Sequence, residues 1–265
     1  MPQRLEMEPD LYGAPRYIKD VSECFFYHTM DLPGYGTVEG QWDLRGKMRD
    51  YLGGIPLKGR RVLDVGAASG FLSLEMERAG AEVVSFDADI ADRIVYLPLQ
   101  KSLYMTNRAQ WRDHMNHFLE IMKNSYWLAH RLNQSKNRVF YGDIYDLPDT
   151  LGMFDVAVVG QILVHLRDPI TALASVGRRC ADVLVVAEGM MESDDCFMQL
   201  LGTTENGRAY SWWHLSTGLY REVMRMIGFE VQAITENKYR CNVSDSPALT
   251  SVKTLIARRT TETRL

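Results

Sequence analysis

The segment RRVLDVGAASGFLSLEME (residues 60–77) constrains the fold more than any other stretch of the sequence. Its first six residues form an apolar run typical of a buried strand, and the residues from 69 onward have helical spacing. Between strand and helix, Gly66 and Gly70 enclose only alanine and serine. Small residues in such a turn allow the backbone to approach a ligand closely. The segment therefore predicts a β-turn-α unit with a ligand site at the end of its strand.

Strands and helices alternate through the rest of the chain. Apolar runs typical of strands occur at 81–89, 138–148, 154–163 and 181–189, helical spacing occurs at 168–180 and 216–229, and a last pair of strands is expected at 229–237 and 251–259. Alternation of this kind indicates a parallel sheet with helices on both faces. The last two strands have no helix between them, so one of them should run antiparallel. We expect an α/β fold with a doubly wound, mostly parallel, seven-stranded sheet and one antiparallel strand near the C-terminus.

Composition excludes several classes of protein. Hydrophobic residues make up 46% and charged residues 24% of the 265-residue chain, values typical of a globular protein. The four cysteines include no CxxC pair, which argues against a zinc site or a disulfide framework, and we expect no metal. The sequence shows neither a signal-peptide pattern nor an apolar run of about 20 residues, so we expect a cytoplasmic protein without a membrane partner.

The expected organisation is an N-terminal arm followed by one domain. Residues 1–50 combine glycines with aromatic residues and are expected to fold over the ligand site as an arm or lid. Residues 51–265 form the predicted ligand-binding domain. It contains a helical insertion at about 88–137, which is much longer than a compact crossover needs.

Acidic residues at strand ends indicate which ligand binds. A dinucleotide site would require the pattern G-x-G-x-x-G, which is absent here. Asp64, just before the glycines, would repel a pyrophosphate but would suit a ligand with a cationic amino group. Asp87 ends the second strand, where a carboxylate can accept both hydroxyls of a ribose. Asp143 after the third strand can accept the amine of an adenine that packs on Ile144. S-adenosylmethionine, which carries no phosphate, has all of these groups.

With these residues the chain resembles the class I S-adenosylmethionine-dependent methyltransferases. The resemblance covers about residues 55–260 and rests on DVGAASG, the acid at 87, GDIYDLP and FDVAVVGQILVHLRDP. It implies a Rossmann-like fold and a cofactor site made by the following residues: Trp42, Lys47, Asp64, Gly66, Ala67, Ser69, Gly70, Asp87, Ala88, Asp143, Ile144 and Gln161. Ala68 departs from the family pattern, which usually has glycine there.

A narrower resemblance concerns the substrate. The segments YHTMDLPGYGTVEGQWDLRGK, LVHLRDP and SWWHLSTGLYREVMRMIGFE are similar to a branch that holds tRNA wobble-uridine 5-oxyacetic acid enzymes and many small-molecule methyltransferases. Trp42 and Lys47 fall where those tRNA enzymes hold a carboxylated donor. The basic residue expected earlier in the arm is absent, which favours ordinary methyl transfer.

We predict a small-molecule acceptor, partly because the net charge of −4 gives no general attraction to nucleic acid. Two alternatives stay open. One is a tRNA-modifying enzyme, which would need a basic patch from Arg167, Arg178, Arg179, Arg258 and Arg259. The other is a noncatalytic protein that binds S-adenosylmethionine.

His165 follows the fourth strand by a few residues, and we predict that it is a catalytic base for a hydroxyl acceptor. The candidate substrate contacts, drawn from the arm, the insertion and a late segment that could close over the methyl group, are Tyr27, Tyr104, Trp111, Trp212, Trp213 and His214. Structural interpretations compete with these roles. His165 could stabilise the adjacent turn, Asp143 could cap its own turn, and Trp42 could be a core aromatic.

Overall fold

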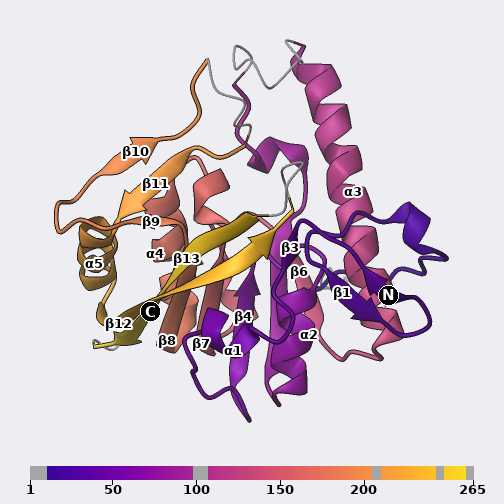
Figure 1. Ribbon diagram of the computed structural model, residues 1–265, viewed down its shortest axis with the longest axis horizontal. Coiled ribbons are helices and arrows are strands. Elements are labelled where there is room, and N and C mark those ends of the chain that lie inside the picture. Colours follow the sequence, from indigo (N-terminus) through magenta and orange to yellow (C-terminus); the bar gives the residue numbers. More distant parts are fainter. Residues whose placement is uncertain (1–10, 98–106, 205–209, 243–247, 261–265) are drawn as a thin grey trace, which may run out of the picture.

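The computed structural model describes residues 11–97, 107–204, 210–242 and 248–260. An eight-stranded sheet in the order β3-β12-β13-β8-β7-β4-β5-β6 forms its centre (Figure 1). These strands are β3 (Trp42–Asp43), β4 (Arg61–Val65), β5 (Glu82–Ala88), β6 (Arg138–Gly142), β7 (Phe154–Gly160), β8 (Cys180–Glu188), β12 (Phe229–Cys241) and β13 (Ala248–Arg259). The five strands β6, β5, β4, β7 and β8 pair in parallel, and β13 is antiparallel to both β8 and β12.

The predicted doubly wound, mostly parallel sheet is confirmed, with one strand more than expected. The extra strand is β3, a two-residue segment of the arm that pairs antiparallel with Arg240–Cys241 at the end of β12. Strand order reverses between β4 and β7, which are neighbours although β5 and β6 lie between them in the sequence. In an open α/β sheet, ligands bind at such a switch point, beyond the carboxyl ends of the strands.

Helices cover both faces of the sheet (Figure 1). The α-helices are α1 (Met48–Tyr51), α2 (Phe71–Arg78), α3 (Arg108–Leu132), α4 (Pro169–Arg179) and α5 (Thr217–Met226), and the 3-10 helices are η1 (Val21–Glu23), η2 (Ala91–Arg93), η3 (Asp149–Leu151) and η4 (Leu163–His165). One core cluster packs α2, α3 and the arm against the sheet, and a second packs α4 and α5 against it. Asp168 caps α4, whose first residue is Pro169.

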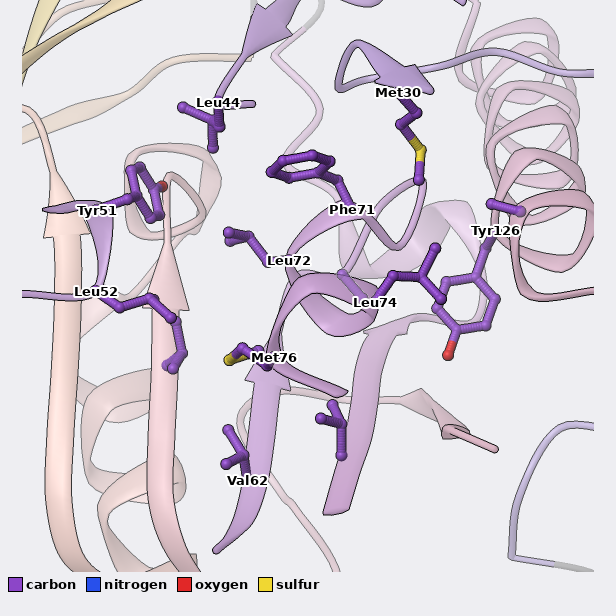
Figure 2. Packing of buried hydrophobic residues seen from close by; sticks show 14 of the residues in the cluster. Met30, Leu44, Tyr51, Leu52, Val62, Phe71, Leu72, Leu74, Met76 and Tyr126 are labelled. Carbon is purple, nitrogen blue, oxygen red and sulfur yellow. The ribbon is translucent and has the colours of Figure 1, made fainter. Parts of the chain in front are cut away.

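The arm contributes side chains to the main core. It forms a hairpin of β1 (Met30–Leu32) and β2 (Gly36–Val38) before it reaches β3. Met30 and Leu44 are buried, and Figure 2 shows them on either side of Phe71 at the start of α2. Trp42 is buried in the same cluster. Within residues 11–50, the arm is therefore held by hydrophobic packing as well as by backbone pairing.

Two further features lie above the carboxyl ends of the strands. A three-stranded sheet has the order β10-β11-β9 and consists of β9 (Met190–Met191), β10 (Met198–Leu200) and β11 (Trp213–Ser216). Helix α3 lies within the predicted helical insertion, of which it makes up half, and it extends past the sheet (Figure 1). Both features therefore flank the edge of the sheet where the switch point lies.

Candidate functional site

The turn after β4 has the conformation that its glycines permit. Gly66 and Gly70 have φ angles of 83° and 82°, in the left-handed region that favours glycine. A Cβ at Gly66 would lie 2.8 Å from Cδ1 of Ile162, and a Cβ at Gly70 would lie 2.8 Å from a ring carbon of Tyr126. Ala68 also has a positive φ, 48°. The turn is thus packed against two neighbouring elements and has no room for larger residues at the two glycines.

Asp64 is buried beneath this turn. Its carboxylate accepts a hydrogen bond of 2.5 Å from the hydroxyl of Ser73, which in turn contacts Ser85. Burial raises the pKa of Asp64 to about 6, and the bond from Ser73 opposes the shift. The carboxyl group is therefore already hydrogen-bonded from α2, and direct pairing with a cationic amino group stays a prediction.

Asp87, at the end of β5, is hydrogen-bonded to the turn formed by residues 66–70, which we call the glycine turn. One carboxylate oxygen accepts the backbone N–H of Ala68 at 2.8 Å, and the other accepts that of Ala88 at 2.7 Å. Burial raises the pKa of Asp87, against these two bonds. A cavity of about 10 Å³ lies beside it, lined in part by Ala67, Lys123 and Tyr141. A ribose would fit the donor and acceptor chemistry here, because each carboxylate oxygen can accept a further hydrogen bond.

Asp143 and Ile144 follow β6. Arg93 donates to one oxygen of Asp143 at 2.8 Å, and the backbone N–H of Tyr145 donates to the other at 3.0 Å. The bond from Tyr145 is a turn cap, which is the structural role that the sequence analysis named as an alternative to ligand binding for Asp143. Ile144 is buried. No pattern in the sequence predicted that Arg93, which lies in the insertion, would contact Asp143.

The segment from Gln161 to His165 follows β7 and contains η4. Gln161 has a φ of 52°, and its backbone N–H donates to the carbonyl oxygen of Ala187 on β8 at 2.9 Å. Nδ1 of His165 is hydrogen-bonded to the carbonyl oxygen of Tyr210. Burial lowers the pKa of His165, against this bond. Because a carbonyl cannot donate, Nδ1 must carry the proton, and neutral His165 keeps its lone pair on Nε2.

The sequence analysis missed Glu188, the last residue of β8. Its side chain is only 2% exposed, and Oε1 accepts the backbone N–H of Leu163 at 2.7 Å. Burial raises the pKa of Glu188 to about 8, against hydrogen bonds from Leu163 and Ile162. The available signal was its position, because an acid that closes the apolar run ADVLVVAE lies at the same sheet edge as Asp64 and Asp87.

The arm is fastened to the glycine turn. The backbone N–H of His28 donates to the hydroxyl of Ser69 at 3.2 Å, and that of Trp42 donates to the carbonyl oxygen of Tyr27 at 3.0 Å. Trp42 is buried in the core, as its structural interpretation anticipated. Burial raises the pKa of Tyr27 to about 12. Lys47 is exposed at the start of α1.

Most candidate substrate contacts lie on the segments above the sheet. Trp111 is buried on α3 in a small cluster that Tyr210 packs against. The backbone N–H of Trp212 donates to the carbonyl oxygen of Val164 at 2.7 Å. His214 lies against Gly189, where a Cβ would come within 2.9 Å of its Nε2. Trp213 is half-buried on β11. Tyr104 lies outside the described residues.

Within residues 11–97, 107–204, 210–242 and 248–260, no group of three or more His, Cys, Asp and Glu side chains could hold a metal ion. None of the helices in the same ranges combines the length and hydropathy that crossing a bilayer requires.

Comparisons with known proteins agree with this geometry. A family model described as a methyltransferase domain matches residues 43–234. An S-adenosylmethionine-dependent methyltransferase from Methanosarcina mazei has a similar structure, with a TM-score of 0.52, 16% identity, and 83% of this chain and 100% of that chain covered. The N-terminal domain of EvdMO1, crystallised with S-adenosylhomocysteine and D-fucose, gives a TM-score of 0.50, 15% identity, and coverage of 91% and 93%.

Identities this low show the fold alone. Among curated proteins, no sequence matches the chain significantly. The family model, however, spans well over half of the chain and includes the glycine turn, Asp87, Asp143 and His165. The protein therefore belongs to the methyltransferase domain family and is a class I S-adenosylmethionine-dependent methyltransferase.

Proposed function

We propose that this enzyme methylates a hydroxyl group of a small molecule and that His165 is the general base. The observation that carries the proposal is the bond between Nδ1 of His165 and the carbonyl oxygen of Tyr210. That bond selects the tautomer with a free lone pair on Nε2. Because burial lowers the pKa of His165, the ring is neutral and able to accept a proton at neutral pH.

S-adenosylmethionine, when bound, supplies a methyl group on a positively charged sulfur. The acceptor oxygen would bond to the methyl carbon as the carbon–sulfur bond broke, and the electron pair of that bond would leave with sulfur. Nε2 of His165 takes the hydroxyl proton and later releases it to water. The glycine turn, Asp64 and Asp87 would hold the donor, with Gln161 beside its methyl end. Alignment of acceptor and donor supplies much of the rate, and His165 is needed because a hydroxyl must lose its proton.

We further propose that the arm, α3 and the segment Trp212–His214 close over the methyl group. Three contacts support the proposal: His28 bonds to the glycine turn, Trp212 bonds to Val164 beside His165, and Tyr210 packs near Trp111. Closure of this kind would exclude water from the reacting atoms.

The charges on the candidate basic patch support a small acceptor over tRNA. Arg179 is buried and paired with Asp149, and Arg258 is paired with Asp182. Arg259 donates to backbone carbonyl oxygens of Gly177 and Cys180. The charges of Arg179 and Arg258 are offset by carboxylates within the fold, and the Arg259 guanidinium is engaged by backbone, which reduces what this patch can offer to phosphates.

The test is a tritiated-methyl assay of wild type and His165→Ala, offered a small-molecule extract and, separately, bulk tRNA. We expect labelling of the small-molecule pool and a fall in kcat of about 100-fold in the variant. His130→Ala is the matched control, because His130 is also half-buried and its ring also contacts a backbone carbonyl oxygen. Labelling of tRNA alone would overturn the choice of acceptor, and an unchanged kcat in His165→Ala would overturn the base.

A further inference from the structure

We propose that Glu188 is a positioning residue for methyl transfer, which holds the Gln161–His165 segment at the carboxyl ends of β7 and β8. The proposal rests on the methyltransferase activity, and its bearing on proton transfer rests on the role proposed for His165. Glu188 is too deeply buried to reach a substrate itself. It can act only through the segment to which it is bonded.

Two consecutive residues of β8 secure this segment. Ala187 accepts the backbone N–H of Gln161 at 2.9 Å, and Glu188 accepts that of Leu163 at 2.7 Å. Gln161 has a left-handed φ of 52°, an unfavourable conformation for a residue with a side chain. Such a conformation persists only where the surroundings hold it, and the two acceptors on β8 do so on both sides of Ile162.

The segment held in this way lies directly against the cofactor turn. The side chain of Ile162 occupies the space that a Cβ of Gly66 would need, with 2.8 Å between the two positions. The hydroxyl of Tyr51 takes the equivalent space at Gly160, also at 2.8 Å. A shift of the backbone at Leu163 would therefore move Ile162 against the glycine turn and His165 relative to the methyl group. Displacements of about 1 Å in such sites cost orders of magnitude in rate.

The groups near Glu188 come from four other elements. Lys253 lies opposite Glu188 on β13, and its ammonium is paired with two other carboxylates. Burial, and to a lesser extent a charge on Glu188, raises the pKa values of Tyr27 on the arm, Tyr51 on α1 and Tyr220 on α5. All three tyrosines are neutral phenols at physiological pH. The hydrogen bond to Leu163 is thus available to a neutral carboxyl group, whose carbonyl oxygen can still accept it.

The experiment compares Glu188→Gln, which keeps an acceptor oxygen of similar reach, with Glu188→Met, which keeps the volume but removes the acceptor. Hydrogen exchange followed by mass spectrometry reports the backbone around Leu163. NMR titration of histidine, assigned with His165→Ala, reports the pKa of His165. Initial rates use the tritiated-methyl assay, and S-adenosylhomocysteine binding is measured by calorimetry. Glu230→Gln is the control, because Glu230 is an exposed carboxylate on β12, level with Val183 at the other end of β8 from Glu188.

We expect Glu188→Met to raise exchange at Leu163 at least tenfold, the order expected when a buried hydrogen bond is lost. The pKa of His165 should move toward its ordinary value, and kcat should fall by about tenfold or more with a smaller change in S-adenosylhomocysteine affinity. In Glu188→Gln, the exchange at Leu163, the pKa of His165 and kcat should all stay near their wild-type values. Unchanged exchange and an unchanged pKa of His165 in Glu188→Met would overturn the proposal, and so would equal losses in the two variants. The exchange result stands even if His165 is no base, which separates the two proposals.

Discussion

Replacing Glu188 with glutamine should make the protein more stable at alkaline pH, by an amount that follows from the burial of this residue. The pKa of Glu188 is raised to about 8 in the folded protein, from an ordinary value near 4.5. Between these values the folded state holds a proton that the unfolded state has released. A group whose folded pKa is raised contributes stability that is fully present below the unfolded pKa and is lost as pH rises through the folded pKa.

The size of the effect comes from the difference in bound protons. Each pH unit in this window lowers the free energy of unfolding by about 1.4 kcal/mol, and the slope flattens near pH 8 as the folded protein ionises. From pH 6 to pH 8 the loss is therefore about 2 kcal/mol for Glu188 alone. Glutamine cannot ionise and keeps an oxygen for Leu163, so the variant escapes this loss. Other titrating groups, such as Asp64, are present in both proteins and cancel in the comparison.

Urea unfolding at pH 6, 7 and 8 measures the difference directly, provided that both proteins show the same m value. The stability of Glu188→Gln relative to wild type should rise by about 2 kcal/mol across this range. Glu230→Gln should show no such trend, because Glu230 is exposed to solvent. Parallel stability curves for wild type and Glu188→Gln would refute the reasoning, since they would mean that Glu188 ionises equally in the folded and unfolded states.

Two further predictions concern the cofactor side of the site. Asp87→Ala should weaken S-adenosylhomocysteine binding by about 1.5–3 kcal/mol, because charge-assisted hydrogen bonds are lost; calorimetry would count against the assigned role if the affinity stayed the same. Gly70→Ala should destabilise the protein more than Gly46→Ala, by about 1 kcal/mol or more, because both positions have left-handed φ angles but only a Cβ at Gly70 would meet a side chain, that of Tyr126. Thermal unfolding of both variants measures the difference in stability. Equal losses of stability in the two variants would show that Tyr126 moves aside without penalty.

The main sheet and its helices could be predicted because their sequence patterns are local. Each apolar run and each helical spacing depends on neighbours within a few residues, and the cap at Asp168 is equally local. The strand β3 had no such signal. It is two residues long, and its pairing partner is Arg240–Cys241, far away in the sequence. Only the folded chain brings these segments together.

In the candidate site too, some features could be predicted from local sequence patterns and others could not. The acids at 64, 87 and 143 could be found because each follows or ends an apolar run at a predictable edge of the sheet. Their partners could not. Arg93 reaches Asp143 from within the insertion, and Tyr210 reaches His165 from a segment more than forty residues later. Such contacts depend on how segments without strong periodicity cross the sheet edge.

The contacts that the sequence did not reveal are also the ones that hold the site in place. Two turns of the site are fastened by groups from other elements: Ser69 by the backbone N–H of His28 in the arm, and Leu163 by the side chain of Glu188. The two central turns also touch, because Ile162 packs on Gly66. A loss at any one of these points would shift the turns relative to each other without removing a group that contacts the ligand. The positions of donor and acceptor thus depend on groups outside the binding surface, and variants of Glu188 should act on kcat more than on cofactor affinity.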